Sequence, residues 1–128
     1  MLACAVSIDG IISLLHKLIL KIPGADVISI LTEKVSGELE MLERHLLILK
    51  QVVENEPIGI LKLAEETKIP SHKVRYSLRI LEQEGLIKAS APGAVTTEHT
   101  DLFLEKLEGM IEDLSSRSEE LKKIKIER

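Results

Sequence analysis

Residues 60–87 read ILKLAEETKIPSHKVRYSLRILEQEGLI, and this stretch decides the expected fold. Its first part, residues 60–67, has the apolar spacing of a short amphipathic helix. Ile60, Leu61 and Ala64 are expected to face inward, whereas the charged residues between them face solvent. The pattern predicts a helix that ends just before a break at residues 68–70.

A second helix is expected after that three-residue break. Ser71 belongs to the residue types that cap helix N-termini, and Gly85 suits the left-handed position that follows a helix. The buried face of this helix is predicted from the spacing of Val74, Leu78 and Leu81. Two helices joined by three residues form a helix-turn-helix.

A small hairpin is expected next. Residues 86–91 and 94–96 flank Pro92 and Gly93, whose order is typical of the centre of a type II turn. The whole stretch therefore predicts a helix-turn-helix with a hairpin wing.

Long helices are expected on the N-terminal side of this unit. Apolar residues recur at helical spacing over residues 8–22, which are too often interrupted by charges to form a membrane span. Asp26 is expected to cap a second helix that runs towards Asn55. Ser36 and Gly37 either interrupt that helix or lie inside it, and the sequence leaves both readings open.

A final helix is expected after the wing, with Thr96 as its cap and Glu98 in its first turn. Its apolar residues follow a heptad rhythm too narrow for an isolated helix, so it is predicted to form the interface of a homodimer. The predicted interface residues are Phe103, Leu107, Met110, Leu114, Leu121 and Ile124.

The expected fold class is therefore mainly α with a small β-hairpin wing, in which long N-terminal and C-terminal coiled-coil-like helices flank a winged helix-turn-helix. Three parts are predicted along the chain. Residues 1–37 form an N-terminal helical extension for dimerisation or partner docking, residues 38–96 the winged helix-turn-helix, and residues 97–128 the C-terminal dimerisation helix.

Composition narrows the possible functions. The lone cysteine, Cys4, excludes an internal disulfide and favours a reducing, cytoplasmic location. No nucleophile and base pattern, glycine-rich phosphate loop or closely spaced His pair is present, so neither an enzyme nor a cofactor or metal site is predicted. Aromatic residues make up only 2% of the chain, which argues against stacking on single-stranded nucleic acid.

Charge is distributed unevenly. The chain carries a formal net charge of -4, yet residues 57–92 contain more basic than acidic side chains. Half of these cations, Lys73, Arg75 and Arg79, lie on the polar face of the helix after Ser71, a face suited to the major groove of duplex DNA. The predicted DNA-binding residues are Ser71, His72, Lys73, Arg75, Tyr76, Arg79 and, in the wing, Lys88.

The stretch from Ile60 to Ile87 resembles the core of prokaryotic winged-helix transcriptional regulators of the MarR and ArsR kind. Leu63-Ala64, Ile69-Pro70 and Gly85-Leu86-Ile87 carry the resemblance, together with the buried positions of the second helix. The resemblance implies a homodimer that places two recognition helices in successive major grooves, with Ser71 near a phosphate.

Two functions from different classes remain. The first is a double-stranded DNA-binding transcriptional regulator that acts as a homodimer. The second is a winged-helix module for protein contacts without direct DNA binding, in which residues 1–37 offer a surface to a protein partner. The outward cations favour the first, and the overall acidity and short wing favour the second.

Overall fold

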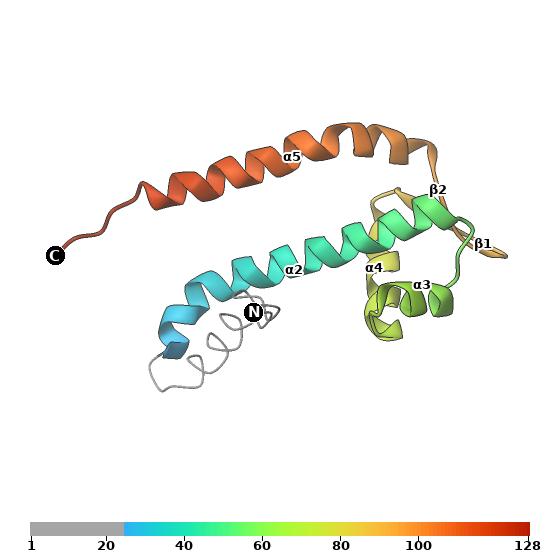
Figure 1. Ribbon diagram of the computed structural model, residues 1–128, viewed down its shortest axis with the longest axis horizontal. Helices are drawn as coiled ribbons and strands as arrows, with labels where there is room; N and C mark the ends of the chain where they lie inside the picture. The colour runs from blue at the N-terminus through green and yellow to red at the C-terminus, as the bar shows by residue number, and fades with distance from the viewer. Residues whose placement is uncertain (1–24) are drawn as a thin grey trace, which may run out of the picture. The chain divides into compact units, whose positions relative to one another are not determined.

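The computed structural model describes residues 25–128 (Figure 1). The chain divides into two compact units, residues 1–43 and residues 44–128. The helix expected over residues 8–22 lies outside the described residues. Within residues 25–128, no helix combines the length and apolarity needed to cross a membrane.

Helix α2 spans Ala25–Asn55 without a break. Of the two readings left open by the sequence, the continuous one is correct, because Gly37 lies inside the helix. A single internal glycine costs a helix only about 1 kcal/mol relative to alanine. The predicted cap at Asp26 is wrong, since the helix already includes Ala25.

The helix-turn-helix is confirmed. Helix α3 spans Ile60–Thr67, helix α4 spans Ser71–Gln83, and three residues connect them. The first of the three, Lys68, ends α3 in the left-handed conformation with φ 62°. Ser71 is not the N-cap as predicted: Pro70 occupies that position, and Ser71 is the first residue of the helix.

Helix α4 ends as predicted, at a left-handed glycine. Gly85 has φ +75°, its N–H donates to the carbonyl of Glu82, and the N–H of Leu86 donates to the carbonyl of Leu81. This pair of hydrogen bonds is a Schellman motif, which turns the chain sharply from the helix into the wing.

One inward-facing residue of α3 was predicted wrongly. Leu61 is 81% exposed, whereas Leu63 is fully buried and Ile60 and Ala64 pack against the core. Leu63 and Ile60 are three positions apart and share one face of the helix, and Leu61 lies off that face.

The wing contains two antiparallel strands, β1 (Ile87–Ser90) and β2 (Gly93–Thr96). Ser90 pairs with Gly93, so the two residues between them form the turn, and the prediction of Pro92 and Gly93 as the turn centre is wrong. Gly93 instead opens β2, where Ile58 pairs with the next residue, Ala94, through backbone hydrogen bonds of 3.2 and 2.8 Å.

Gly93 is required by that close approach. Its φ is +143°, and a Cβ built there would lie 2.6 Å from the backbone carbon of Ile58. No side chain fits at this distance. The glycine therefore lets the segment before α3 join the wing as a one-residue third strand.

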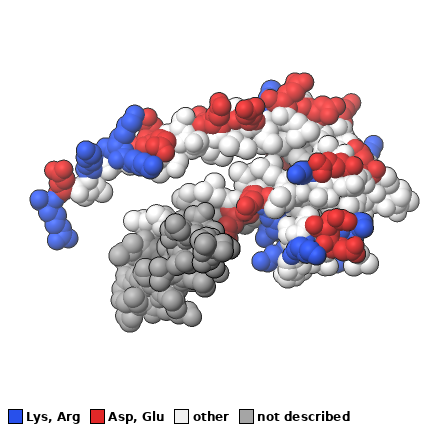
Figure 2. All heavy atoms as spheres, in the orientation of Figure 1, with Lys and Arg blue, Asp and Glu red and all other residues white. Residues whose placement is uncertain are grey.

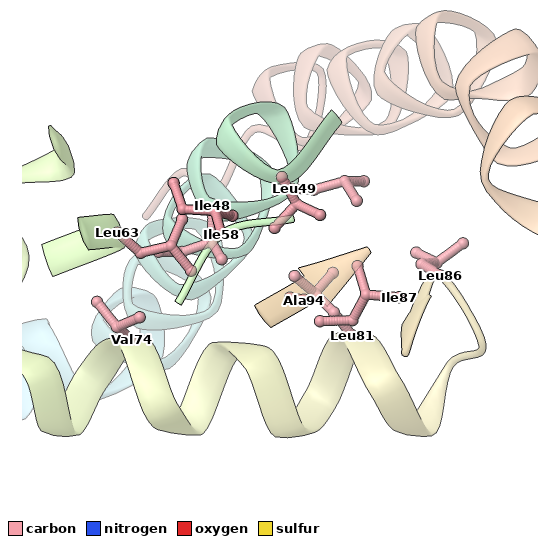
Figure 3. Packing of buried hydrophobic residues seen from close by; sticks show 10 residues of the cluster. Ile48, Leu49, Ile58, Leu63, Val74, Leu81, Leu86, Ile87 and Ala94 are labelled. Atoms are coloured by element: carbon pink, nitrogen blue, oxygen red, sulfur yellow. The ribbon is translucent and has the colours of Figure 1, made fainter. Parts of the chain in front are cut away.

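All the elements of the helix-turn-helix and wing contribute to one hydrophobic core (Figure 3). Helix α2 supplies three of its buried residues, and α3, α4 and the wing surround them. The buried core residues are Ile48, Leu49, Val52, Ile58, Leu63, Val74, Leu81, Leu86, Ile87 and Ala94.

Helix α5 spans Glu98–Lys122 and begins one residue later than predicted. The N-cap is Thr97, which forms a capping box with Thr100, and not Thr96. Thr96 is engaged elsewhere: its N–H and hydroxyl donate to the carboxylate of Glu56, over 2.9 and 3.0 Å. The buried Thr100 hydroxyl donates to the carbonyl of Leu86 over 2.7 Å, which fastens α5 to the start of the wing.

We expect Gly93→Ala to destabilise the protein by about 2 kcal/mol or more, because the added methyl group meets the Ile58 backbone in a conformation that disfavours side chains. Urea denaturation followed by circular dichroism measures the change. The matched control is Gly109→Ala in α5, where no atom lies within 4 Å of the added methyl group. That change should stabilise the helix by about 0.5–1 kcal/mol, and a similar effect at both positions would contradict the account.

Candidate nucleic-acid interface

Helix α4 buries one side and exposes the other. Val74, Ser77 and Leu81 are buried. Its exposed side chains include the predicted ones, His72, Lys73, Arg75, Tyr76 and Arg79, and Ser71 at the helix start is half-buried. The helix therefore presents the predicted polar face to solvent.

The cations of this face have no carboxylate partners among the described residues. Every Lys or Arg that forms a salt bridge within residues 25–128 lies off α4 and off the wing. These cations are Lys62, Arg117, Lys122 and Lys123. Lys62 illustrates the difference, because the side chains of Glu66 and Glu65 raise its pKa. The positive charges on α4 and β1 remain available to an external anion.

One flank of α4 faces the wing. A cleft of about 400 Å³ lies between α4 and the hairpin, and Arg75, Arg79 and Lys88 line it together with Glu82. Its floor is apolar, formed in part by Leu78 and Ile87. The structure thus brings together three of the predicted DNA-binding residues from two separate elements.

The opposite flank of α4 faces α2, through residues that the sequence analysis missed. Ser77 is fully buried, and its hydroxyl oxygen accepts a hydrogen bond from Arg44 Nε over 3.1 Å. The same hydroxyl lies 2.9 Å from His45 Nδ1. The Arg44 guanidinium also lies 5.9 Å from the centre of the Tyr76 ring, within the range of a cation–π contact.

Tyr76 therefore contacts residues of α2, which its position on α4 alone did not predict. Its ring centre lies 6.1 Å from that of His45 at a tilt of 40°, and the residue is 41% exposed. The only sequence signal for these contacts is the serine itself, a polar residue three positions after Val74 on the apolar side of α4.

The two flanks lie on nearly opposite sides of the helix. Lys73 and Arg75 are two positions apart, which is a rotation of about 200° in an α-helix. Lys73 lies one turn before Ser77 on the α2 side, whereas Arg75 lines the cleft beside the wing. Arg79 lies on the same flank as Arg75, and His72 lies between the two flanks. Helix α4 thus carries cations on its exposed face and along both edges.

The surface charge is positive along most of α4 and negative at the end of α4 and along α5. Glu82 lies in the last turn of α4 and Glu84 directly follows the helix, so the positive charge lies before them, from Lys73 to Arg79. Figure 2 shows acidic side chains in a row along α5. The basic surface is therefore local to α4 and its two edges, although the chain as a whole is acidic.

The predicted dimer-interface residues lie in two different settings. Phe103 packs against the hydrophobic core, and Leu107 lines a groove of about 330 Å³ with Leu46, Leu49 and Val53 of α2. The others are exposed by 42–65%, and the last of them follows the end of α5. These exposed residues are Met110, Leu114, Leu121 and Ile124.

The part of the chain that the structure describes contains no group of three or more His, Cys, Asp and Glu side chains that could hold a metal ion.

Comparison with known families agrees with the fold. Residues 41–88 match a family model described as winged helix-turn-helix DNA-binding, and these residues run from within α2 into β1. No curated protein sequence matches the chain. Among solved structures, the activation domain of the phage T4 transcription factor MotA is similar over 56% of this chain and 83% of that one, at 20% identity and a TM-score of 0.44. So loose a likeness carries no argument about function.

We expect Ser77→Ala to lower the free energy of unfolding by about 1 kcal/mol, because Arg44 and His45 lose the hydroxyl that both contact. The control is Ser116→Ala on the exposed surface of α5, where the change should stay within about 0.5 kcal/mol. Equal effects of the two substitutions in urea denaturation would show that the buried hydroxyl contributes nothing.

Proposed function

We propose that this protein is a transcriptional regulator that binds double-stranded DNA by placing α4 in the major groove. The observation that carries the proposal is the set of exposed cations on α4 and β1 that have no carboxylate partner among the described residues. The match of residues 41–88 to a DNA-binding winged helix-turn-helix family supports it.

The exposed face of α4 suits the groove in shape and chemistry. The major groove is about 12 Å wide and admits one α-helix. Arg75 and Arg79 each carry a planar guanidinium that can donate two hydrogen bonds to the edge of a guanine. Phosphates would repel the carboxylates of Glu82 and Glu84, so α4 enters the groove with its residues up to Arg79, and its acidic end points away.

The wing contributes phosphate contacts. Lys88 lines the cleft with Arg75 and Arg79, and a DNA strand that borders the major groove would pass close to this cleft. Lys88 is the only cation of the hairpin, so the wing neutralises few phosphates. Helix α4 would supply most of the affinity.

We further propose that the protein acts as a homodimer of the MarR and ArsR kind inside the cell, by binding and not by catalysis. Three exposed apolar residues of α5, Met110, Leu114 and Leu121, recur at heptad spacing, and a second copy of the helix would bury them. Two recognition helices in one dimer would read a palindromic site, which raises affinity and specificity together.

The alternative function is a protein-docking module that does not touch DNA. Apolar residues exposed along the N-terminal half of α2 favour it, because such surfaces mark interaction sites. These residues are Ile30, Leu31, Val35 and Leu39, each more than half exposed. The proposed partner would dock through residues 1–37, and no DNA binding at low salt would favour this alternative.

We expect Arg75→Ala combined with Arg79→Ala to weaken duplex binding by about 30-fold or more, since two groove contacts worth about 1–3 kcal/mol each are lost. A titration of a random-sequence duplex pool, followed by fluorescence anisotropy, measures the affinity. Both side chains are exposed, so helical content should not change.

The control for that experiment removes the same charge elsewhere. Lys122→Ala with Lys123→Ala also deletes two cations, but both are paired with Glu119 and Glu120 at the far end of α5. This variant should bind DNA nearly as the wild type does. Equal loss of binding in both variants would indicate a general charge effect and contradict the assignment to α4.

We expect Leu114→Glu to split or weaken the dimer, because it places a charge within the proposed apolar interface. Ser115→Glu adds the same charge at the next position, outside the heptad spacing, and should leave the dimer intact. Light scattering at several protein concentrations distinguishes them. A dimer unaffected by Leu114→Glu would refute the α5 interface.

A further inference from the structure

The flank of α4 that faces α2 contains one cation that comes from neither the recognition helix nor the wing. Arg44 lies in α2 and reaches α4 through Ser77, 33 residues away in sequence. Its guanidinium lies beside Tyr76, which is on the exposed face of α4. The long side chain is therefore held at the edge of the proposed DNA-binding surface.

Only part of the Arg44 guanidinium is used by these contacts. Nε donates to the Ser77 hydroxyl, and a guanidinium carries four further N–H donors on its two terminal nitrogens. Within residues 25–128, Arg44 forms no salt bridge with an acidic side chain, and Ser77 is its hydrogen-bond partner. A charged group with four free donors at a protein surface is suited to bind an anion.

We propose that Arg44 is a phosphate-binding residue of the DNA interface, positioned by Ser77 and Tyr76. The inference rests on the proposed function and adds to it a residue outside the helix-turn-helix. A DNA duplex that receives α4 in its major groove presents one phosphate backbone along each edge of that helix. Lys88 and Arg75 serve the edge beside the wing, and Arg44 with Lys73 serves the opposite edge.

Positioning distinguishes Arg44 from an ordinary surface arginine. An unrestrained arginine loses about 2 kcal/mol of side-chain rotational freedom when a ligand fixes it. The buried Ser77 hydroxyl and the Tyr76 ring already restrict Arg44 in the free protein. The contact with phosphate therefore costs less entropy than a contact from a mobile side chain would.

The test measures how duplex affinity depends on salt, with a random-sequence duplex pool as the probe. Each phosphate neutralised contributes about -0.9 to the slope of log affinity against log salt. Arg44→Gln should reduce the steepness of the slope by about 0.9 and weaken binding about five- to tenfold at 0.1 M salt. The sequences enriched from the pool should not change, because phosphates carry no base identity.

Two further variants separate the charge of Arg44 from its position. Arg44→Lys retains the charge without the Nε–H bond to Ser77, and should restore the wild-type slope with weaker binding. Ser77→Ala keeps Arg44 in the sequence but removes the hydroxyl that positions its side chain. This variant should likewise weaken binding without changing the slope. If Arg44 were only a stability contact, Arg44→Gln would lower the melting temperature and leave the slope unchanged.

The matched control is Lys50→Gln, which removes one exposed cation from the same helix α2 at a position that lines the groove beside α5. Its slope should equal that of the wild type. A wild-type slope in Arg44→Gln, alongside lost binding in the Arg75 and Arg79 double variant, would overturn the role of Arg44 alone. Absence of duplex binding by the wild-type protein would overturn the proposed function and this inference together.

Discussion

The burial of one side of α4 in the core shared with α2, α3 and the wing determines what the rest of the structure can do. Val74 and Leu81 enter the core, where Leu81 lies close to Ala94 and Ile87 of the wing (Figure 3), and Ser77 is buried between them in the helix. Because that side is buried, the helical period fixes the direction in which every other side chain of α4 points. The helix must present its cations to solvent because its apolar residues are already committed.

This constraint also explains how an acidic protein can carry a basic surface. The carboxylates are carried by α2, α3 and α5 and by the end of α4, and some of them pair with nearby cations. Among the described residues, none forms a salt bridge with a cation of α4. Electrostatic attraction in salt acts over about 10 Å, so the local balance of charge governs the approach of DNA more than the net charge does.

The sequence predicted the fold class and the main elements, because helix-turn-helix signals are local: amphipathic spacing, a three-residue break, and a glycine after the second helix. The predictions were wrong at positions where tertiary contacts decide which residue is buried or which residue caps a helix. Leu61 and Leu63 look equally apolar, and only the packing into the shared core selects Leu63. Thr96 and Thr97 are equally good caps, and the carboxylate of Glu56 draws Thr96 into the wing.

The exposed face of α4 was predicted from helical spacing, since its members lie on one segment. The contribution of Arg44 was not, because no pattern within either helix shows that a residue of α2 meets Ser77. Similarly, the cleft that gathers Arg75, Arg79 and Lys88 depends on how the hairpin folds back onto α4. Contacts between residues of different elements can be identified only from the three-dimensional structure. Residues that share one face of a helix can be predicted from the helical period alone.

The contact between Gly93 and Ile58 has a consequence for how the wing can vary. The base of the hairpin is pinned by backbone hydrogen bonds to the segment before α3, and its tip is a two-residue turn that carries no part of the core. The base of the hairpin is therefore structurally constrained, whereas its tip is not. A longer loop between Ser90 and Gly93 would leave this register intact, so the surface at the tip can change while the core beneath it stays the same.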